Sequence, residues 1–214
     1  MIALQMEVMM VVTGHGIEQA LSGRVFRSMF EERKRVFVDL LGWDIPVLAR
    51  RYEIDQFDDD EAVYIVITDD TGEHTGSARL LQTDRPHILD TIFPNLCNRV
   101  PPTGPTVREI TRFCLARRLK ARERLATRNR LVSALVEYAL SNGILTYTGV
   151  AEWAWFQQIL AFGWECLPLG LPDNNDPRGL SAMQINIGPD TPNLLRQSGI
   201  FAQIHLMDLD CAAA

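Results

Sequence analysis

Arg33 is a charged residue on a face of the chain that is otherwise apolar. Apolar residues recur at three- and four-residue steps over residues 18–41, which predicts an amphipathic helix. Arg33 lies between Phe30 and Phe37 on the apolar side of this helix. An unpaired guanidinium among apolar side chains is very costly, so it must reach solvent or meet carboxylates. The fold is therefore restricted to those that bring acidic side chains to this helix.

Two predicted strands repeat the same feature. Arg79 shares one strand face with Leu81, because side chains alternate along a strand. Arg112, by the same alternation, shares a face of a later strand with Ile110 and Cys114. Three arginines on apolar faces need three sets of acidic partners within one fold.

The acidic stretch over residues 53–61 is the nearest source of such partners, and its Asp55 and Asp58 can supply them. The arrangement is open to two interpretations, a structural salt-bridge network or a functional site. As a metal site the stretch lacks the ligand order and the central glycine of an EF-hand loop. A solvated acidic loop is its ordinary interpretation, and we predict no metal.

Length and composition predict a single domain over residues 1–214. The chain is 47% hydrophobic and 22% charged, which is typical of a globular protein with ample material for a core. The net charge of −6 disfavours a dedicated nucleic-acid binder. Four cysteines without CxxC spacing offer no zinc signature and are typical of a reducing cytoplasm.

The start of the chain does not resemble a secretory signal. Residues 1–12 include Glu7, and no Lys or Arg precedes Arg24, so this segment is predicted to be a first strand. No run approaches the about 18 apolar residues of a membrane span. We expect a cytoplasmic protein without a membrane span.

The charge is divided along the chain. Residues 51–100 hold 11 acidic and 4 basic residues, whereas residues 101–150 hold 9 basic and 3 acidic residues. The arginine-rich segment over residues 117–130 has no interleaved aromatic residues for base stacking, which argues against nucleic acid. Either it is solvated, or it docks an acidic or phosphorylated partner. The candidate docking residues are Arg117, Arg118, Lys120, Arg122 and Arg124.

Predicted strands alternate with helices, with a long hairpin in the first half. This order is typical of α/β or α+β proteins with a mixed central sheet. Besides those over residues 1–12 and 18–41, we expect strands over 62–67, 76–83, 108–116, 144–150, 165–169 and 182–187, helices ending at 142, spanning 151–162 and following 191, and a short helix plus irregular loop within 84–107.

Five motifs occur in a fixed order and spacing. They read Arg33-x-x-x-Phe37-x-x-x-Leu41-Gly42-Trp43, Glu53-x-Asp55-Gln56-Phe57-Asp58, Ala62-x-Tyr64-Ile65, Gly76-x-x-Arg79-Leu80-Leu81-x-Thr83 and Glu109-x-Thr111-Arg112-Phe113. Together they resemble the acyl-homoserine lactone synthases, the autoinducer synthases of bacterial quorum sensing. The dense match covers about residues 24–116, and the acyl-pocket region is expected over about residues 117–190.

The resemblance implies a GNAT-like acyltransferase sandwich, α/β (α+β), with a mixed, mostly antiparallel central sheet flanked by helices. It also implies acyl transfer from an acyl-CoA or an acyl carrier protein to the α-amine of S-adenosylmethionine. Closure of a lactone then expels methylthioadenosine. S-adenosylmethionine is a cosubstrate in this scheme, and no tightly bound cofactor is expected.

Site residues follow from the resemblance. Glu109 is the expected general base, and Arg112 is expected to pair with nearby acids and hold a loop and a strand in register. The residues expected to bind S-adenosylmethionine are Arg33, Phe37, Trp43, Asp55, Asp58, Arg79 and Phe113. Those expected to line the acyl pocket are Thr148, Trp153 and Trp155.

Two other functions stay open. One is an N-acyltransferase of the GNAT type that acts on another amine, although the usual Q/R-x-x-G-x-G/A pyrophosphate loop is missing from the sequence. The other is a non-catalytic domain whose divided charge docks partners. The acyl chain, the choice of donor and the oligomeric state are not determined by the sequence.

Overall fold

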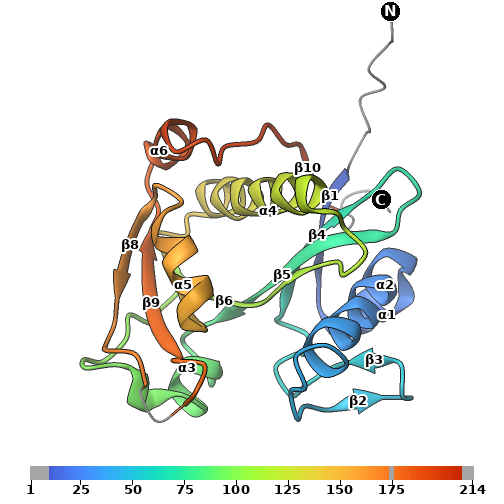
Figure 1. Cartoon of the computed structure of the whole chain (residues 1–214), viewed down its shortest axis with the longest axis horizontal. Coiled ribbons are helices and arrows are strands. Elements are labelled where there is room, and N and C mark those ends of the chain that lie inside the picture. Colours follow the sequence, from blue (N-terminus) through green and yellow to red (C-terminus); the bar gives the residue numbers. More distant parts are fainter. Residues whose placement is uncertain (1–9, 174–175, 209–214) are drawn as a thin grey trace, which may run out of the picture.

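The computed structural model describes residues 10–173 and 176–208, in which eight strands form one sheet with helices on both faces (Figure 1). The part of the expected first strand before Met10 lies outside these residues. The strands of the sheet are β1 (Met10–His15), β4 (Val63–Thr68), β5 (His74–Gln82), β6 (Val107–Leu115), β7 (Thr146–Ala151), β8 (Glu165–Pro168), β9 (Ser181–Asn186) and β10 (Leu206–Asp208).

Helices and one small hairpin complete the described fold. The helices are α1 (Ile17–Ser22), α2 (Arg24–Arg33), a π-helical turn (Lys34–Val38), α3 (Ile88–Thr91), a 3₁₀ turn (Pro94–Leu96), α4 (Ala121–Ser141), α5 (Trp153–Leu160) and α6 (Thr191–Gln197). The hairpin is formed by β2 (Val47–Leu48) and β3 (Tyr52–Glu53). Within the described residues, no helix has both the length and the apolar character needed to cross a membrane.

The sheet is mixed and mostly antiparallel, as the sequence predicts. Its strand order is β10-β1-β4-β5-β6-β7-β9-β8, and only the pairs β10–β1 and β6–β7 are parallel. The expected hairpin is β4 and β5, paired antiparallel from Val63↔Leu80 onward.

The two faces of the sheet carry separate cores. Leu131 and Leu135 of α4 pack with Ile65 and Leu80 on one face. On the other face, α1 and α2 pack on alternate positions of the same strands, with Phe26, Phe30, Tyr64 and Val66 in contact. Neighbouring positions along β4 point into opposite cores, because side chains alternate along a strand. A charged side chain between the sheet and α2 is therefore surrounded by the second of these cores.

The sheet divides between β6 and β7 (Figure 1). The parallel ladder between them ends at the pair Ile110–Gly149. Beyond that pair, β6 continues to Leu115 and β7 continues to Ala151 without pairing to each other. This opening leaves the β7-facing edge of β6 without a strand partner in the described part of the chain.

The expected continuous helix over residues 18–41 is wrong. Gly23 separates α1 from α2, and its φ of −82° and ψ of 138° are extended rather than helical. The last helical turn is a π-turn, in which the Asp39 N–H donates to Lys34 O and the Leu41 N–H donates to Val36 O. The spacing of apolar residues is nearly the same in an α-helical turn and in a single π-turn. The sequence pattern alone therefore does not predict the π-turn.

The strands β2, β3 and β10 were not expected from the sequence. Each has only two or three residues, which is too short to show the alternation that marks a strand. The hairpin of β2 and β3 lies below α2 in Figure 1, and its Glu53 accepts a hydrogen bond from Arg112 of β6.

Candidate active site

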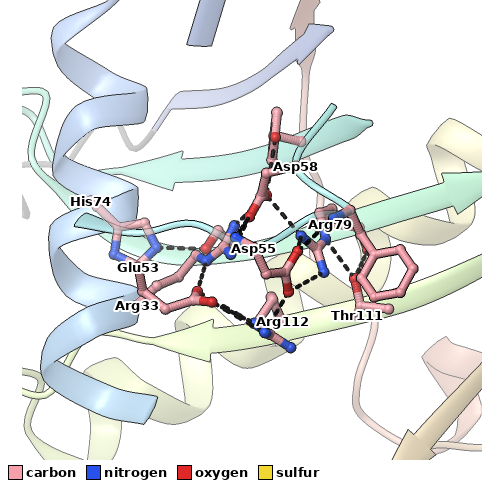
Figure 2. Close-up of polar contacts among 11 residues, drawn as sticks. Arg33, Glu53, Asp55, Asp58, His74, Arg79, Thr111 and Arg112 are labelled. Atoms are coloured by element: carbon pink, nitrogen blue, oxygen red, sulfur yellow. Dashed lines mark hydrogen bonds and ion pairs between the residues drawn. The ribbon is translucent and has the colours of Figure 1, made fainter. Parts of the chain in front are cut away.

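Arg33 lies at the end of α2 and points into the space between this helix and the sheet (Figure 2). Its Nε is 2.5 Å from Oε2 of Glu53, and its Nη1 and Nη2 donate to the two oxygens of Asp58 at 2.9 and 2.8 Å. Its guanidinium lies 5.0 Å from the centre of the Phe30 ring. The Arg33 side chain is 1% exposed, so the predicted need for carboxylate partners is confirmed.

Arg79, on β5, is the second buried cation. Its Nη1 lies 2.6 Å from Oδ1 of Asp55 and 2.8 Å from Oδ1 of Asp58. Its Nη2 donates to Asp55 Oδ2 at 3.1 Å, and its Nε donates to the Thr111 hydroxyl at 2.9 Å. The expected pairing of Asp55 and Asp58 with Arg33 and Arg79 is confirmed.

Arg112 occupies a bulge in β6. The register pairs Arg79 with Thr111 and Ser77 with Cys114, so β6 has one more residue than β5 across this step. The φ of Arg112 is 51°, in the left-handed region. This backbone costs about 1–2 kcal/mol for a residue with a Cβ, so surrounding contacts must hold it.

The bulge places Arg112 on the α2 face of the sheet. Its Nη2 is 3.1 Å from Oε1 of Glu53 and 2.6 Å from Oδ2 of Asp55. Ile110 and Phe113 instead pack against the core under α4. The expectation that Arg112 shares a face with Ile110 is therefore wrong, because strict alternation fails across a bulge.

The site balances three guanidinium groups against three carboxylates. Burial alone would raise the pKa of Asp58, but the charges of Arg33 and Arg79 outweigh it and lower that pKa well below its usual range. The pKa of Asp55 is also lowered, by Arg79 and then Arg112, against the opposing effect of burial. Burial opposes ionisation of Arg33 as well, yet Asp58 and Glu53 raise its pKa further. Asp58, Asp55 and Arg33 are therefore charged at neutral pH.

The acidic stretch is only in part the solvated loop expected from sequence, because Asp60 and Glu61 are exposed whereas the three carboxylates of the site are buried. Glu53 is 0% exposed and Asp58 is 6% exposed. Oxygens of Glu53, Asp55 and Asp58 lie within 4.8 Å of one another, a spacing that suits a cation. Each of these carboxylates is already paired with arginine, so guanidinium groups take the place of a metal.

The aromatic residues Phe37 and Trp43 form a stacked pair next to Arg112. Their ring centres are 4.7 Å apart with an interplanar angle of 19°. The Arg112 guanidinium lies 5.7 Å from each ring centre. The Trp43 Nε1 is buried without a hydrogen-bond partner in the described residues. The pair is thus brought beside the arginines, as expected for this site.

Glu109, on β6, is a buried carboxylate outside the arginine cluster. Its Oε2 accepts the Ile88 N–H at 2.8 Å, at the first turn of α3. Its Oε1 is buried and has no hydrogen-bond partner in the part of the chain that the structure describes. Burial raises the pKa of Glu109 to about 7, although the N–H groups of Leu89 and Ile88 and the charge of Arg79 lower it. A group with this pKa can exchange a proton near neutral pH.

The expected acyl-pocket residues lie on two elements, Thr148 on β7 and both tryptophans on α5. Thr148 pairs in register with Glu109 across β6 and β7, and its buried hydroxyl also has no partner among the described residues. Trp155 contacts Phe113, with ring centres 5.3 Å apart, on the α4 side of the sheet. Trp153 is 40% exposed and contacts Phe156 instead. Phe113 thus lies on the opposite face from the arginines with which the sequence grouped it.

The five expected docking residues are all exposed: Arg122 and Arg124 lie in α4, Lys120 is its N-cap, and Arg117 and Arg118 lie in the turn between β6 and α4. Arg118 is tied to the β4–β5 turn, because its Nη2 is 2.7 Å from Asp69 Oδ2 and its Nη1 donates to His74 O. Arg122 and Arg124 lie in the first two turns of the helix. The basic residues therefore belong to the N-terminus of α4 and to the turn that precedes it.

Three further residues belong to the site but were given no role from sequence. They are Glu53, Thr111 and Tyr64, whose hydroxyl donates to Asp58 Oδ1 at 3.1 Å. Counting charges could have found Glu53, because three arginines with only two assigned carboxylates leave one cation unbalanced. Thr111 and Tyr64 carry no comparable signal, since neutral hydroxyl groups on strands are common.

Comparison with known proteins places the chain in a family. The family model described as autoinducer synthase matches residues 18–174. The chain is 40% identical over 124 residues to the acyl-homoserine-lactone synthase of Ralstonia nicotianae, covering 55% of this chain and 60% of that protein. It is 36% identical over 151 residues to the acyl-homoserine-lactone synthase of Rhizobium etli, covering 68% and 70% of the two chains.

Solved structures of acyl-homoserine lactone synthases superpose on this chain over nearly its whole length. The CoA-dependent acyl-homoserine lactone synthase BjaI, solved with SAM and isopentyl-CoA, has a TM-score of 0.79 at 25% identity, with 96% of this chain and 97% of BjaI covered. The AHL synthase LasI has a TM-score of 0.78 at 25% identity, covering 93% and 99%. A protein from Lactobacillus plantarum assigned as an N-acetyltransferase, 17% identical with a TM-score of 0.54, shares the fold alone.

The GNAT-like fold, the family and its enzyme class, expected from five motifs, are confirmed at the level of the family. The chain belongs to the autoinducer synthase family, the acyl-homoserine-lactone synthases.

Proposed function

We propose that this chain joins an acyl group from a thioester to the α-amine of S-adenosylmethionine and then closes a homoserine lactone. One observation carries the proposal: Glu109 is buried, has a pKa of about 7, and keeps one carboxylate oxygen without a partner in the described residues. It lies beside the point where β6 and β7 separate. An amine nucleophile needs a base of this strength, because it reacts only after losing a proton.

The bond changes balance without a redox partner. Glu109 takes one proton from the ammonium of S-adenosylmethionine, the nitrogen forms a bond to the thioester carbon, and the carbon–sulfur bond breaks. The second proton of the nitrogen goes to the departing thiolate. The carboxylate of the methionyl group then attacks its own γ-carbon, and the bond to the sulfonium breaks to release methylthioadenosine.

The edge of β6 beyond Ile110 is proposed to bind the thioester oxygen. The β7-facing edge of β6 beyond Ile110 pairs with no strand in the described residues, so backbone N–H groups on that edge can stabilise negative charge as it develops on the oxygen. Thr148 adds a hydroxyl beside Glu109 without a partner in the described residues. We propose that these donors and Glu109 act together on the reacting carbonyl.

The ring of charges is proposed to shape the S-adenosylmethionine site. Arg112 is its most exposed guanidinium, at 9%, and its contacts to Glu53 and Asp55 use Nε and Nη2. Its Nη1 is therefore the group that we assign to the carboxylate of S-adenosylmethionine. Phe37 and Trp43 provide the aromatic wall that suits a sulfonium cation.

An acyl-CoA is the donor that the comparisons favour, by similarity to BjaI with its isopentyl-CoA. The contact between Phe113 and Trp155 supports a short, flat or branched acyl group, since two large rings fill the space next to β6. The basic start of α4 suits either donor, because coenzyme A carries phosphates and carrier proteins are acidic. We propose that the reaction takes place in the cytoplasm, where both substrates are made.

The test is to incubate the purified chain with S-adenosylmethionine and a panel of acyl-CoA and acyl-carrier-protein thioesters. We expect thiol release together with equal amounts of a lactone and methylthioadenosine in the mass spectrum. Thiol release that depends on another amine would instead support a different N-acyltransferase. No turnover with any donor would support a non-catalytic docking domain.

A further inference from the structure

Glu53 closes a ring of six alternating charges. Asp58 bridges Arg33 to Arg79, and Asp55 bridges Arg79 to Arg112. Glu53 completes the circle, since its Oε2 is 2.5 Å from Arg33 Nε and its Oε1 is 3.1 Å from Arg112 Nη2 (Figure 2). Its side chain is 0% exposed, the lowest value of the six together with Asp58 and Arg79.

The position of Glu53 in the fold is unlike that of the other carboxylates. It lies on β3, in the small hairpin, whereas Asp55 and Asp58 lie in the loop that leads to β4. Its two partners are on α2 and on the bulge of β6. Glu53 is therefore the carboxylate of the ring that ties α2 directly to the bulge.

The bulge needs this support. Arg112 has a φ of 51°, which is unfavourable for any residue with a Cβ and persists only when its surroundings hold it. The Arg112 Nε donates to both oxygens of Glu53, at 3.2 and 3.3 Å, whereas Asp55 receives a single bond from Nη2. Without Glu53, Arg112 would keep one carboxylate shared with Arg79, and the ring would carry a net positive charge in a buried space.

We infer that Glu53 is a positioning residue: by holding Arg112 it fixes the bulge of β6, and with it the backbone N–H groups proposed to receive the thioester oxygen. This inference rests on the proposed function. Glu53 itself touches no reacting atom, because its side chain is enclosed by Arg33 and Arg112. Its effect on catalysis is therefore transmitted through the backbone of residues 110–114.

The experiment compares Glu53→Gln with Glu61→Gln. The two substitutions remove the same charge from the same acidic stretch, but Glu61 is exposed and its side chain accepts a hydrogen bond from the Gln82 amide at 2.9 Å, away from the ring. For Glu53→Gln we expect kcat to fall at least about tenfold, while hydrogen exchange of residues 109–115 becomes at least about fivefold faster. Exchange of the α4 core, residues 131–139, stays as in the unmodified chain. Glu61→Gln leaves all three quantities unchanged.

Two results would overturn the inference. One is an unchanged kcat and unchanged exchange at residues 109–115 in Glu53→Gln. The other is faster exchange in α4 to the same degree as in β6, since that pattern shows a general loss of stability. If Glu53→Gln does not fold, Glu53→Asp keeps the charge but shortens the reach, and it is expected to show a smaller change in the same two quantities.

Failure of the proposed function has a separate signature. If the unmodified chain makes no lactone from any thioester, the chemistry proposed above is wrong. Hydrogen exchange at residues 109–115 still tests whether Glu53 holds the bulge, because that measurement needs no substrate. If lactone forms and Glu53→Gln forms it at the same rate, the positioning role alone is wrong.

Discussion

At the scale of single residues, Glu109 connects burial to the pH dependence of turnover. Burial raises its pKa to about 7, and the proposed base must be ionised to accept a proton. We therefore expect kcat/KM to rise with pH and to level off above about pH 7. Measuring kcat/KM from pH 5 to pH 9 checks this. Glu109→Gln should lose about 100-fold in kcat and lose the step near pH 7.

The same pKa predicts a pH-dependent stability. In the unfolded chain Glu109 titrates near its ordinary value of 4.5, whereas in the native protein it keeps its proton up to about pH 7. The unfolded state therefore binds fewer protons between these values, and native stability falls as pH rises through this window. The full effect is about 3 kcal/mol.

Glu109→Gln removes this titration, so the variant gains stability relative to the unmodified chain between pH 4.5 and pH 7. Urea unfolding of both proteins at pH 4.5 and pH 7.5 measures the difference in the free energy of unfolding. An equal difference at the two pH values would show that Glu109 is not buried with a raised pKa.

The ring residues predict a joint loss of activity and stability. Arg33→Ala, Asp55→Ala and Arg112→Ala each leave a charge without its partner, and each is expected to abolish most turnover. Breaking a buried pair costs about 3–5 kcal/mol, so circular dichroism and thermal unfolding must accompany the rate measurements. Unchanged activity in all three variants would contradict the assignment of the site.

At the scale of elements, two irregularities of the backbone decide where the site side chains lie. The π-turn after α2 contains Phe37 and precedes Trp43, and the stacked rings of these two residues lie next to Arg112. The bulge in β6 turns Arg112 to the ring side, while its neighbour Phe113 turns to the α4 side of the sheet. One irregular turn and one extra residue therefore decide which side chains meet.

The turn between β2 and β3 is strained. Ala49 and Arg50 have φ values of 50° and 56°, and the Arg51 N–H donates to Leu48 O across them. Two central residues with positive φ are the pattern of a type I′ turn, which favours Asn-Gly. Ala49→Asn with Arg50→Gly should raise the free energy of unfolding by about 1 kcal/mol.

Urea unfolding measures that gain, with lactone formation as the control. Both positions are exposed, so activity should stay within about twofold of the unmodified chain. A loss of stability would mean that the hairpin does not adopt this turn.

At the scale of the whole molecule, the acidic and basic halves of the sequence have different places. All three ring carboxylates come from the acidic stretch and their side chains are buried, whereas the candidate docking residues of the arginine-rich segment are exposed at the start of α4 and in the turn before it. The net charge of −6 conceals this separation. The buried half balances internal cations, and the exposed half is proposed to meet an anionic acyl donor.

Charge reversal tests the proposed docking surface. Arg122→Glu with Arg124→Glu should raise the KM for an anionic acyl donor by about tenfold, because steering by surface charge is lost. The KM for S-adenosylmethionine should stay unchanged. Added salt should raise the donor KM of the unmodified chain more than that of the variant. Arg99→Glu, an exposed change in another loop, is the control, and an equal effect there would contradict a specific docking surface.

The sequence by itself determined that the buried arginines need carboxylate partners, that the chain forms a mixed sheet, and which family it belongs to. A buried guanidinium requires carboxylates wherever it occurs, and the apolar periods along the strands and α4 are local properties of the chain. The tertiary structure alone decided that Glu53 closes the ring, that Arg112 leaves the face of Ile110, and that Glu109 has a pKa of about 7. These features depend on which distant segments exclude water and which residue forms a bulge, and neither is recorded in the order of neighbouring side chains.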